Sequence, residues 1–164
     1  MEARVSSNPC LACSINQGCC SDLKGLRLTP GEYETHFARH AQRLHIARDG
    51  PQYQVSSKDG PCPNWRGGCT VYEARPMECR LFPVTVTAVA TIGPTVVAVA
   101  SERTLCPQKA QLQPSDHDAR TLIEGFLREA YGAHRPVRVV FDRGPGRVLA
   151  LAVKAARRLT RPSA

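Results

Sequence analysis

The sequence contains few aromatic residues and no long apolar run. Only 5% of its 164 residues are Phe, Trp or Tyr, and Trp65 is the single tryptophan. Its apolar tracts are short and broken by Thr, Gly or Pro, so none approaches the roughly 18 apolar residues of a membrane span. The first residues also lack the apolar segment of a secretory signal. We therefore expect no transmembrane segment and a cytoplasmic location.

Acidic residues are missing from the C-terminal end of the chain. From Arg143 onward there are six Lys or Arg and no Asp or Glu, whereas the whole chain has a net charge of +8. A nucleic-acid interaction would have to depend on this tail, which has no aromatic residues among its basic ones, so the signal for it is weak. We expect a cysteine-cluster metal-binding domain over residues 1–142 and a basic helix or tail over 143–164.

The composition indicates a real hydrophobic core. Apolar residues make up 42% of the chain, so a chain of this length can fold without disulfides. The pattern predicts a small single domain of α+β class, with a cysteine-rich loop region, a β-hairpin and two to three helices.

Local signals place these elements. Thr29, Pro30 and Glu32 form the start of a helix with a capping box, and the apolar spacing continues it towards Gly50-Pro51. The remaining expected elements are a hairpin of 84–92 and 95–101 around Gly93-Pro94, a helix opened by Ser115 and Asp118 and closed by Gly132, and a strand over 137–141.

The cysteines are the most informative residues. They are Cys10, Cys13, Cys19, Cys20, Cys62, Cys69, Cys79 and Cys106. Four of them fall within eleven residues, which is improbable for inert buried thiols alone. Thiols in the cytoplasm are normally reduced, so this even number indicates metal ligation before disulfides. We interpret all eight as candidate metal ligands.

The spacing leaves the metal open. A Cys-x-x-Cys turn can grip one metal centre, and the Cys-Pro steps at Cys62 and Cys106 are typical of cluster ligands. A simple zinc ribbon would need a second Cys-x-x-Cys, which is absent. Zinc takes four ligands, and a two-iron or four-iron (4Fe–4S) cluster takes four thiolates as well. The expected cofactor is therefore an iron–sulfur cluster or zinc, with a slight preference for the cluster.

The longer motif resembles a known family. It runs Cys10-x2-Cys13-x5-Cys19-Cys20, then Pro61-Cys62-Pro63, then Cys69-x2-Tyr72-x2-Arg75-Pro76-x2-Cys79-Arg80-x-Phe82-Pro83. Over residues 8–108 it is similar to the zinc- or iron-chelating cysteine-cluster family. This resemblance implies a metal-binding protein, and some members of the family are linked to lysine methylation of flagellin.

Other side chains are candidates for supporting roles. Arg75 and Arg80 can offset the negative charge of a thiolate-bound centre, although solvated surface arginines are an equally good interpretation for Arg80. Trp65 can shield the site from water or lie on the surface. His36 and His40 stand four residues apart, a zinc-ligand spacing, but the segment lacks the Glu of a zinc protease, and an exposed polar face is the better interpretation.

Three functions follow as hypotheses. The first is a metal- or cluster-binding protein with a redox, sensing or accessory role and a protein partner. The second is a protein-modifying enzyme, like the flagellin lysine methylases, that depends on the metal centre. The sequence has no Gly-rich nucleotide loop and no nucleophile elbow to support it. The third is a zinc-stabilised interaction module.

Overall fold

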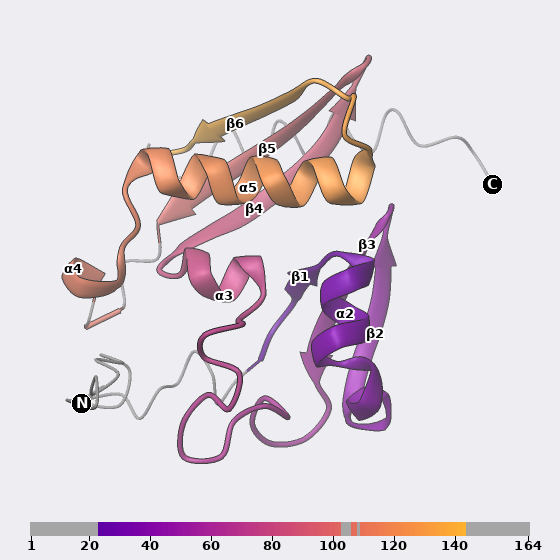
Figure 1. Ribbon diagram of the computed structural model, residues 1–164, viewed down its shortest axis with the longest axis vertical. Coiled ribbons are helices and arrows are strands. Elements are labelled where there is room, and N and C mark those ends of the chain that lie inside the picture. Colours follow the sequence, from indigo (N-terminus) through magenta and orange to yellow (C-terminus); the bar gives the residue numbers. More distant parts are fainter. Residues whose placement is uncertain (1–22, 103–105, 108, 144–164) are drawn as a thin grey trace, which may run out of the picture.

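The computed structural model describes residues 23–102, 106–107 and 109–143, and it confirms a small single domain of mixed α+β class (Figure 1). Two three-stranded sheets lie in two halves of the molecule, one N-terminal and one C-terminal. The elements are β1 (Leu26–Leu28), α2 (Pro30–His36), the 3-10 helix η2 (Ala38–Arg43), β2 (Leu44–Asp49), β3 (Gln52–Ser57), α3 (Met77–Leu81), β4 (Val84–Ile92), β5 (Thr95–Glu102), α4 (Lys109–Leu112), α5 (Asp116–Tyr131) and β6 (Val137–Phe141).

The C-terminal half is the hairpin β4–β5 with β6 added in parallel to β5. Gly93 has a φ of 58° in the turn, a conformation that glycine adopts without strain. Helix α5 connects β5 to β6 and covers one face of the sheet (Figure 1). Its apolar stripe enters the larger core cluster beside the inward-facing valines and alanines of the strands. The predicted hairpin, helix and strand are confirmed.

Both ends of α5 follow the expected capping chemistry. The side chain of Ser115 accepts a hydrogen bond from the backbone N–H of Asp118 at 3.1 Å. At the other end, Gly132 has a φ of 104° and its N–H donates to the carbonyl of Arg128. The helix therefore begins and ends where its polar and glycine residues allow it.

The N-terminal half is the sheet β1-β3-β2, in which both neighbouring pairs are antiparallel. Helix α2 begins with the predicted capping box, because Thr29 accepts from the N–H of Glu32 and Glu32 accepts from the N–H of Thr29, both at 3.1 Å. Tyr33 and Phe37 pack into a second, smaller core cluster with apolar residues of all three strands.

The expectation that this helix continues to Gly50 is wrong. Helix α2 ends at His36, η2 follows, and Leu44–Asp49 is strand β2. Along β2 only Leu44 is fully buried. A helix continued through this segment would therefore have no further core against which to bury its apolar side chains. The backbone of β2 pairs with β3 instead, and Gly50, with a φ of 65°, forms the hairpin turn. The sequence pattern predicts neither this second hairpin nor strand β1, which pairs with β3.

A buried polar contact joins the two halves. The backbone N–H of Arg27 donates to the Glu78 carboxylate at 2.6 Å, and the Arg27 guanidinium lies 3.5 Å from the same carboxylate. This guanidinium also donates to the carbonyl of Val86 on β4. The two side chains are only 13% and 8% exposed, so their charges are paired largely out of water. Strand β1, helix α3 and strand β4 are thereby tied together.

Within the described ranges, no helix has both the length and the apolar character needed to cross a bilayer. The basic helix or tail is expected over residues 143–164. Only Arg143 of this range is described, and residues 144–164 lie outside the described residues.

Candidate metal centre

The structure describes four of the eight cysteines. Cys62, Cys69, Cys79 and Cys106 are free thiols, and each is half-buried. The other four predicted ligands, Cys10, Cys13, Cys19 and Cys20, lie outside the described residues.

Two of these thiols lie in the long loop between β3 and α3. The loop turns at Cys62, whose carbonyl accepts from the N–H of Trp65 at 2.8 Å, and Trp65 in turn forms an isolated β-bridge with Cys69. Buried Asn64 fastens the loop to the helical segment, because its side-chain amide donates to the carbonyl of His36 at 3.1 Å. The backbone and side chain of Thr70 both donate to the Asn64 carbonyl at 2.9 Å. These bonds therefore fix Cys62 and Cys69 within one ordered loop.

The third thiol, Cys79, lies on the short helix α3. Its N–H donates to the carbonyl of Pro76 at 3.0 Å. The start of this helix is anchored by the N-terminal half, since the N–H of Met77 donates to the Glu32 carboxylate at 2.5 Å. Cys79 and Cys62 both pack against the smaller core cluster. Glu32 thus places Cys79 relative to the sheet that also supports Cys62.

Neighbouring thiols raise the pKa of two of these cysteines, Cys62 and Cys79. Burial raises the pKa of the Cys79 thiol far above its usual range, and negative charge on Cys62, Glu78 and Cys69 raises it further. Burial also raises the pKa of the Cys62 thiol, to which Cys69 contributes as well. Cys62 and Cys79 pack against the same core cluster, and Trp65 connects Cys62 to Cys69, so two loop positions and one helix position lie in one region. Cys106 is not among the groups that act on Cys62 or Cys79.

Positive and polar groups oppose this effect at two of the thiols. The backbone N–H of Asn64 and the Arg43 guanidinium favour the thiolate of Cys62 and so lower its pKa. Arg75 does the same for Cys79. Arg75 is held in place by the backbone of Tyr72, whose carbonyl accepts from Arg75 Nε at 2.7 Å, and its guanidinium stacks 3.6 Å from the centre of the Tyr72 ring.

The two predicted arginines therefore differ. Arg75 lies where its charge acts on the Cys79 thiol, and its supporting role at a metal centre stays a prediction. Arg80 is exposed, and its charge acts instead on the Glu32 carboxyl. Arg43 was not singled out from the sequence, because nothing in its local context indicates that the hairpin of the first sheet brings it near Cys62.

The histidine pair does not keep its expected spacing on a single helix. His36 is the last residue of α2, whereas His40 lies in η2, and both are half-buried rather than on an exposed face. The Nε2 atom of His40 accepts from Arg39 Nε at 3.1 Å. Trp65, Tyr72 and Phe82 are also half-buried.

Among the described residues, no group of three or more His, Cys, Asp or Glu side chains is close enough to hold a metal ion by itself. Cys62, Cys69 and Cys79 lie in one region, but their side chains are not close enough together to coordinate one metal ion. A full set would need a rearrangement of these thiols or further ligands from residues 1–22.

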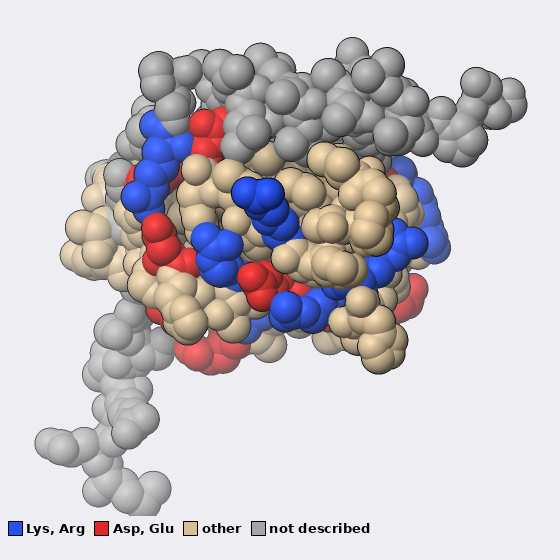
Figure 2. Space-filling view, turned by 90° about the horizontal axis from the view of Figure 1, so that it is seen from above, with Lys and Arg blue, Asp and Glu red and all other residues tan. Residues whose placement is uncertain are grey.

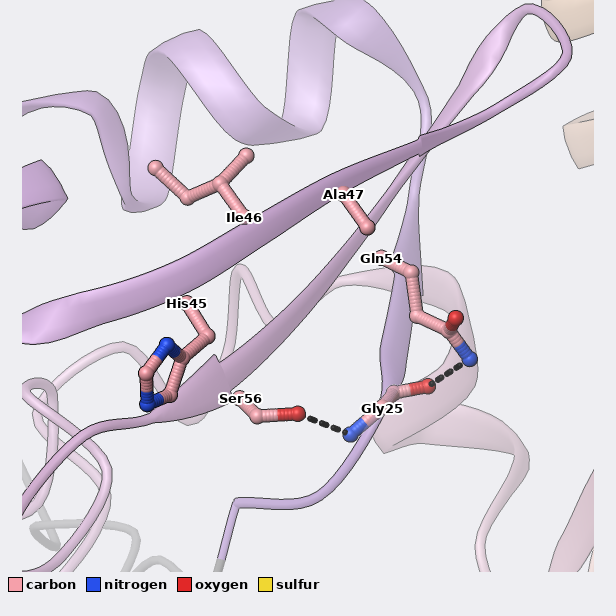
Figure 3. Close-up of a pocket in the computed structure, with 6 residues that line it drawn as sticks. All are labelled: Gly25, His45, Ile46, Ala47, Gln54 and Ser56. Carbon is pink, nitrogen blue, oxygen red and sulfur yellow. Dashed lines mark hydrogen bonds between the residues drawn. The ribbon is translucent and has the colours of Figure 1, made fainter.

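The structure also contains a hollow of about 390 Å³ on the outer surface of the first sheet (Figure 3). His45, Ala47, Gln54 and Ser56 line it together with Gly25, while Ile46 projects from the opposite side of β2. Its polar groups bond to one another: Gly25 N donates to Ser56 Oγ at 2.8 Å, and Gln54 Nε2 donates to the Gly25 carbonyl at 3.4 Å. The hollow contains no cysteine and no pair of titratable groups, so it does not form a catalytic constellation.

Comparison with known proteins finds no matching family model, no matching curated protein and no matching solved structure.

Proposed function

We propose that this protein binds a metal centre, either zinc or an iron–sulfur cluster, through its clustered cysteines. The observation that carries the proposal is that Cys62 and Cys79, from a loop and a separate helix, pack against one core cluster, with Cys69 bridged to Cys62 through Trp65. The remaining ligands are proposed to come from the N-terminal group Cys10, Cys13, Cys19 and Cys20. The likeness of the motif around residues 62–83 to the zinc- or iron-chelating cysteine-cluster family belongs to the same proposal.

The chemistry of the donor set fits a metal cation. Neighbouring half-buried thiols resist ionisation because each thiolate loses hydration and repels the next. A bound cation reverses this balance, since it replaces the protons and turns the repulsion into attraction. The N–H of Asn64 and the guanidinium groups of Arg43 and Arg75 favour the ionised sulfurs in the same way. These groups form a polar surrounding for negative sulfur.

A bound centre would supply structural cross-linking in the zinc form and electron storage in the iron form. We propose a redox, sensing or accessory role for the protein, in a reducing compartment such as the cytoplasm, where thiols stay available for metal.

The proposal is tested by purifying the full chain without oxygen and measuring iron, zinc and acid-labile sulfide, with a visible spectrum. Iron with sulfide would identify a cluster, and zinc without sulfide would identify a zinc site. Cys62→Ser and Cys79→Ser are each expected to lower the metal content severalfold, because the hydroxyl is a much poorer ligand than a thiolate for these metals.

Cys106→Ser is the matched control. Cys106 is also half-buried, but it is not among the groups that shift the pKa of Cys62 or Cys79, so the variant is expected to keep most of its metal. If the wild-type protein contains neither metal, or if the Cys62 and Cys79 variants keep as much metal as wild type, the proposal is wrong.

A further inference from the structure

A group of basic side chains lies beside the cysteine loop. It consists of Arg39, His40 and Arg43 from η2 and Arg66 from the loop, and we call it the arginine patch. All three arginines are exposed. Arg39, His40 and Arg43 share η2, and the bond from Asn64 to the His36 carbonyl brings the loop that carries Arg66 to the same part of the surface. The charges of all three arginines act on the His40 imidazole.

Hydrogen bonds connect the two segments that form the patch. Asn64 binds the His36 carbonyl and so holds the cysteine loop against the end of α2. On the other side, the backbone N–H of Lys58 donates to the Arg43 carbonyl at 3.0 Å, and Lys58 Nζ donates to the Gln42 carbonyl at 3.0 Å. Lys58 therefore adds a further positive charge at the end of η2. The two segments that carry the patch, η2 and the cysteine loop, are therefore held together by hydrogen bonds.

The helical segment of the patch is basic. The stretch from His36 to Arg48 contains no Asp or Glu, and within the described part of the chain no ion pair joins an arginine of the patch to a carboxylate. Burial and the three arginines lower the pKa of His40, so the imidazole stays neutral and accepts from Arg39 Nε at 3.1 Å. The opposite half of the molecule is different. Figure 2 looks down on it and shows acidic and basic side chains side by side, and ion pairs such as Arg128–Glu124 at 3.0 Å occur there.

The patch also adjoins the candidate metal centre. Arg43 acts on the Cys62 thiol, and Arg66 lies between Cys62 and Cys69 in the loop sequence. Anything bound to the patch is therefore brought up against the cysteine site. A group of exposed positive charges next to a site attracts negatively charged partners and speeds their association.

We propose that the arginine patch docks an acidic protein surface beside the cysteine site. The value of docking a partner next to the cysteines rests on the proposed metal function, whereas binding of the acidic surface does not. A nucleic acid fits less well, because the large apolar side chains that are exposed in the described part of the chain are Ile46 and Ile92, and Trp65 beside Arg66 is half-buried. Ile46 lies three residues after Arg43, so an apolar contact is available close to the charged one in sequence.

The test measures binding of a fluorescent ten-residue polyglutamate peptide to the purified full chain by anisotropy, at low and at moderate salt. The wild-type protein is expected to bind it in a salt-dependent manner. Arg39→Glu/Arg43→Glu is expected to weaken binding by about tenfold, because it replaces two attractions with two repulsions. Arg66→Glu, on the other segment, is expected to weaken binding by about threefold, and it tests the proposal if the double variant does not fold.

Two controls carry the same change of net charge. Arg135→Glu/Arg138→Glu alters exposed arginines of the other half, and Arg157→Glu/Arg158→Glu alters the basic tail. Both are expected to change binding by less than about twofold at moderate salt. Equal loss in the tail variant and the patch variant would overturn the proposal, as would unchanged binding in the patch variants. Tighter binding of an oligothymidine of matched charge would also overturn it, in favour of nucleic acid.

Metal content is measured on the same samples. A patch variant that keeps its metal and loses the peptide supports the docking surface independently of the ligands. A wild-type protein that holds no metal but binds the peptide through the patch would leave the docking surface standing and remove the proposed function.

Discussion

The two halves of the molecule reach stability in different ways. Among the described residues, thirteen form the apolar cluster of the C-terminal half and seven form that of the N-terminal half, against which Cys62 and Cys79 pack. Burial of apolar area is the main source of folding free energy, so the smaller cluster provides less of it. The comparison indicates that the N-terminal half depends more on its polar anchors and on the cysteine site.

The largest expected effect comes from matched core deletions in the two halves. Phe37→Ala and Phe126→Ala should each lower the free energy of unfolding by about 3–5 kcal/mol, because each removes a buried ring and leaves a cavity. Phe37→Ala should also lower the metal content of the purified protein, since Phe37 belongs to the cluster that supports Cys62 and Cys79. Urea unfolding and elemental analysis measure the two quantities. Equal loss of metal in both variants would show that the halves do not differ in this respect.

A second prediction concerns the contact that joins the halves. Arg27→Met should lower the free energy of unfolding by about 3 kcal/mol, because it removes a buried guanidinium that neutralises charge on the buried Glu78 carboxylate and also donates to the Val86 carbonyl. Arg48→Met is the matched control: Arg48 is exposed and stacks on Tyr53, so its loss should cost less than about 1 kcal/mol. Urea unfolding distinguishes the two, and similar costs would mean that burial does not set the value of the Arg27 contact.

The helix caps give a smaller difference between the halves. Thr29→Ala should cost about 1–2 kcal/mol, because Thr29 is buried and forms a reciprocal capping box. Ser115→Ala removes an exposed cap with one bond to the backbone and should cost about 0.5–1 kcal/mol. Thermal or urea unfolding of the two variants provides the comparison, which fails if the exposed cap proves the more costly to lose.

The smallest expected effect is a pH dependence at Glu32. Burial raises the pKa of this carboxyl above its ordinary value of 4.5, and the hydrogen bonds from Met77 and Thr29 only partly oppose this. The folded state therefore holds the proton more tightly than the unfolded state. The resulting stabilisation is complete below the ordinary value and is lost as the pH rises through the folded-state pKa.

Glu32→Gln removes the titration. The free energy of unfolding of wild type minus that of the variant should therefore fall as the pH rises from about 4 to about 7. Urea unfolding across this range measures the difference, and a constant difference would contradict the raised pKa.

The C-terminal half could be predicted from sequence because its signals are local. Val and Thr runs around Gly93, the Ser115 cap and the apolar stripe of α5 each specify their own structure. The first sheet lacks such signals. Strand β2 buries only Leu44 fully, and the fully buried position of β3 next to the turn is a glutamine, Gln52, whose side-chain amide lies 3.3 Å from the Tyr131 hydroxyl.

The residues of the candidate site also fall into two groups, those that the sequence predicts and those that it does not. The cysteines and Arg75 could be selected from the motif, because their residue types and spacing carry the chemistry. Arg43, Glu32 and Glu78 could not, since each acts through a contact with a residue far away in sequence. Pairing of β2 with β3 sets the position of Arg43, and that pairing has no strong local pattern.

One carboxylate has a consequence for how this chain can vary. Glu32 holds both the first N–H of its own helical segment and the N–H of Met77, so the starts of α2 and α3 are fixed to a common point. The position of Cys79 is then independent of the path taken by the intervening loop. Gly67, at a φ of 73° with open space around it, marks a place where that loop can lengthen or shorten. Related chains can therefore differ in the span between the first two described cysteines, Cys62 and Cys69, and still present Cys79 in the same position.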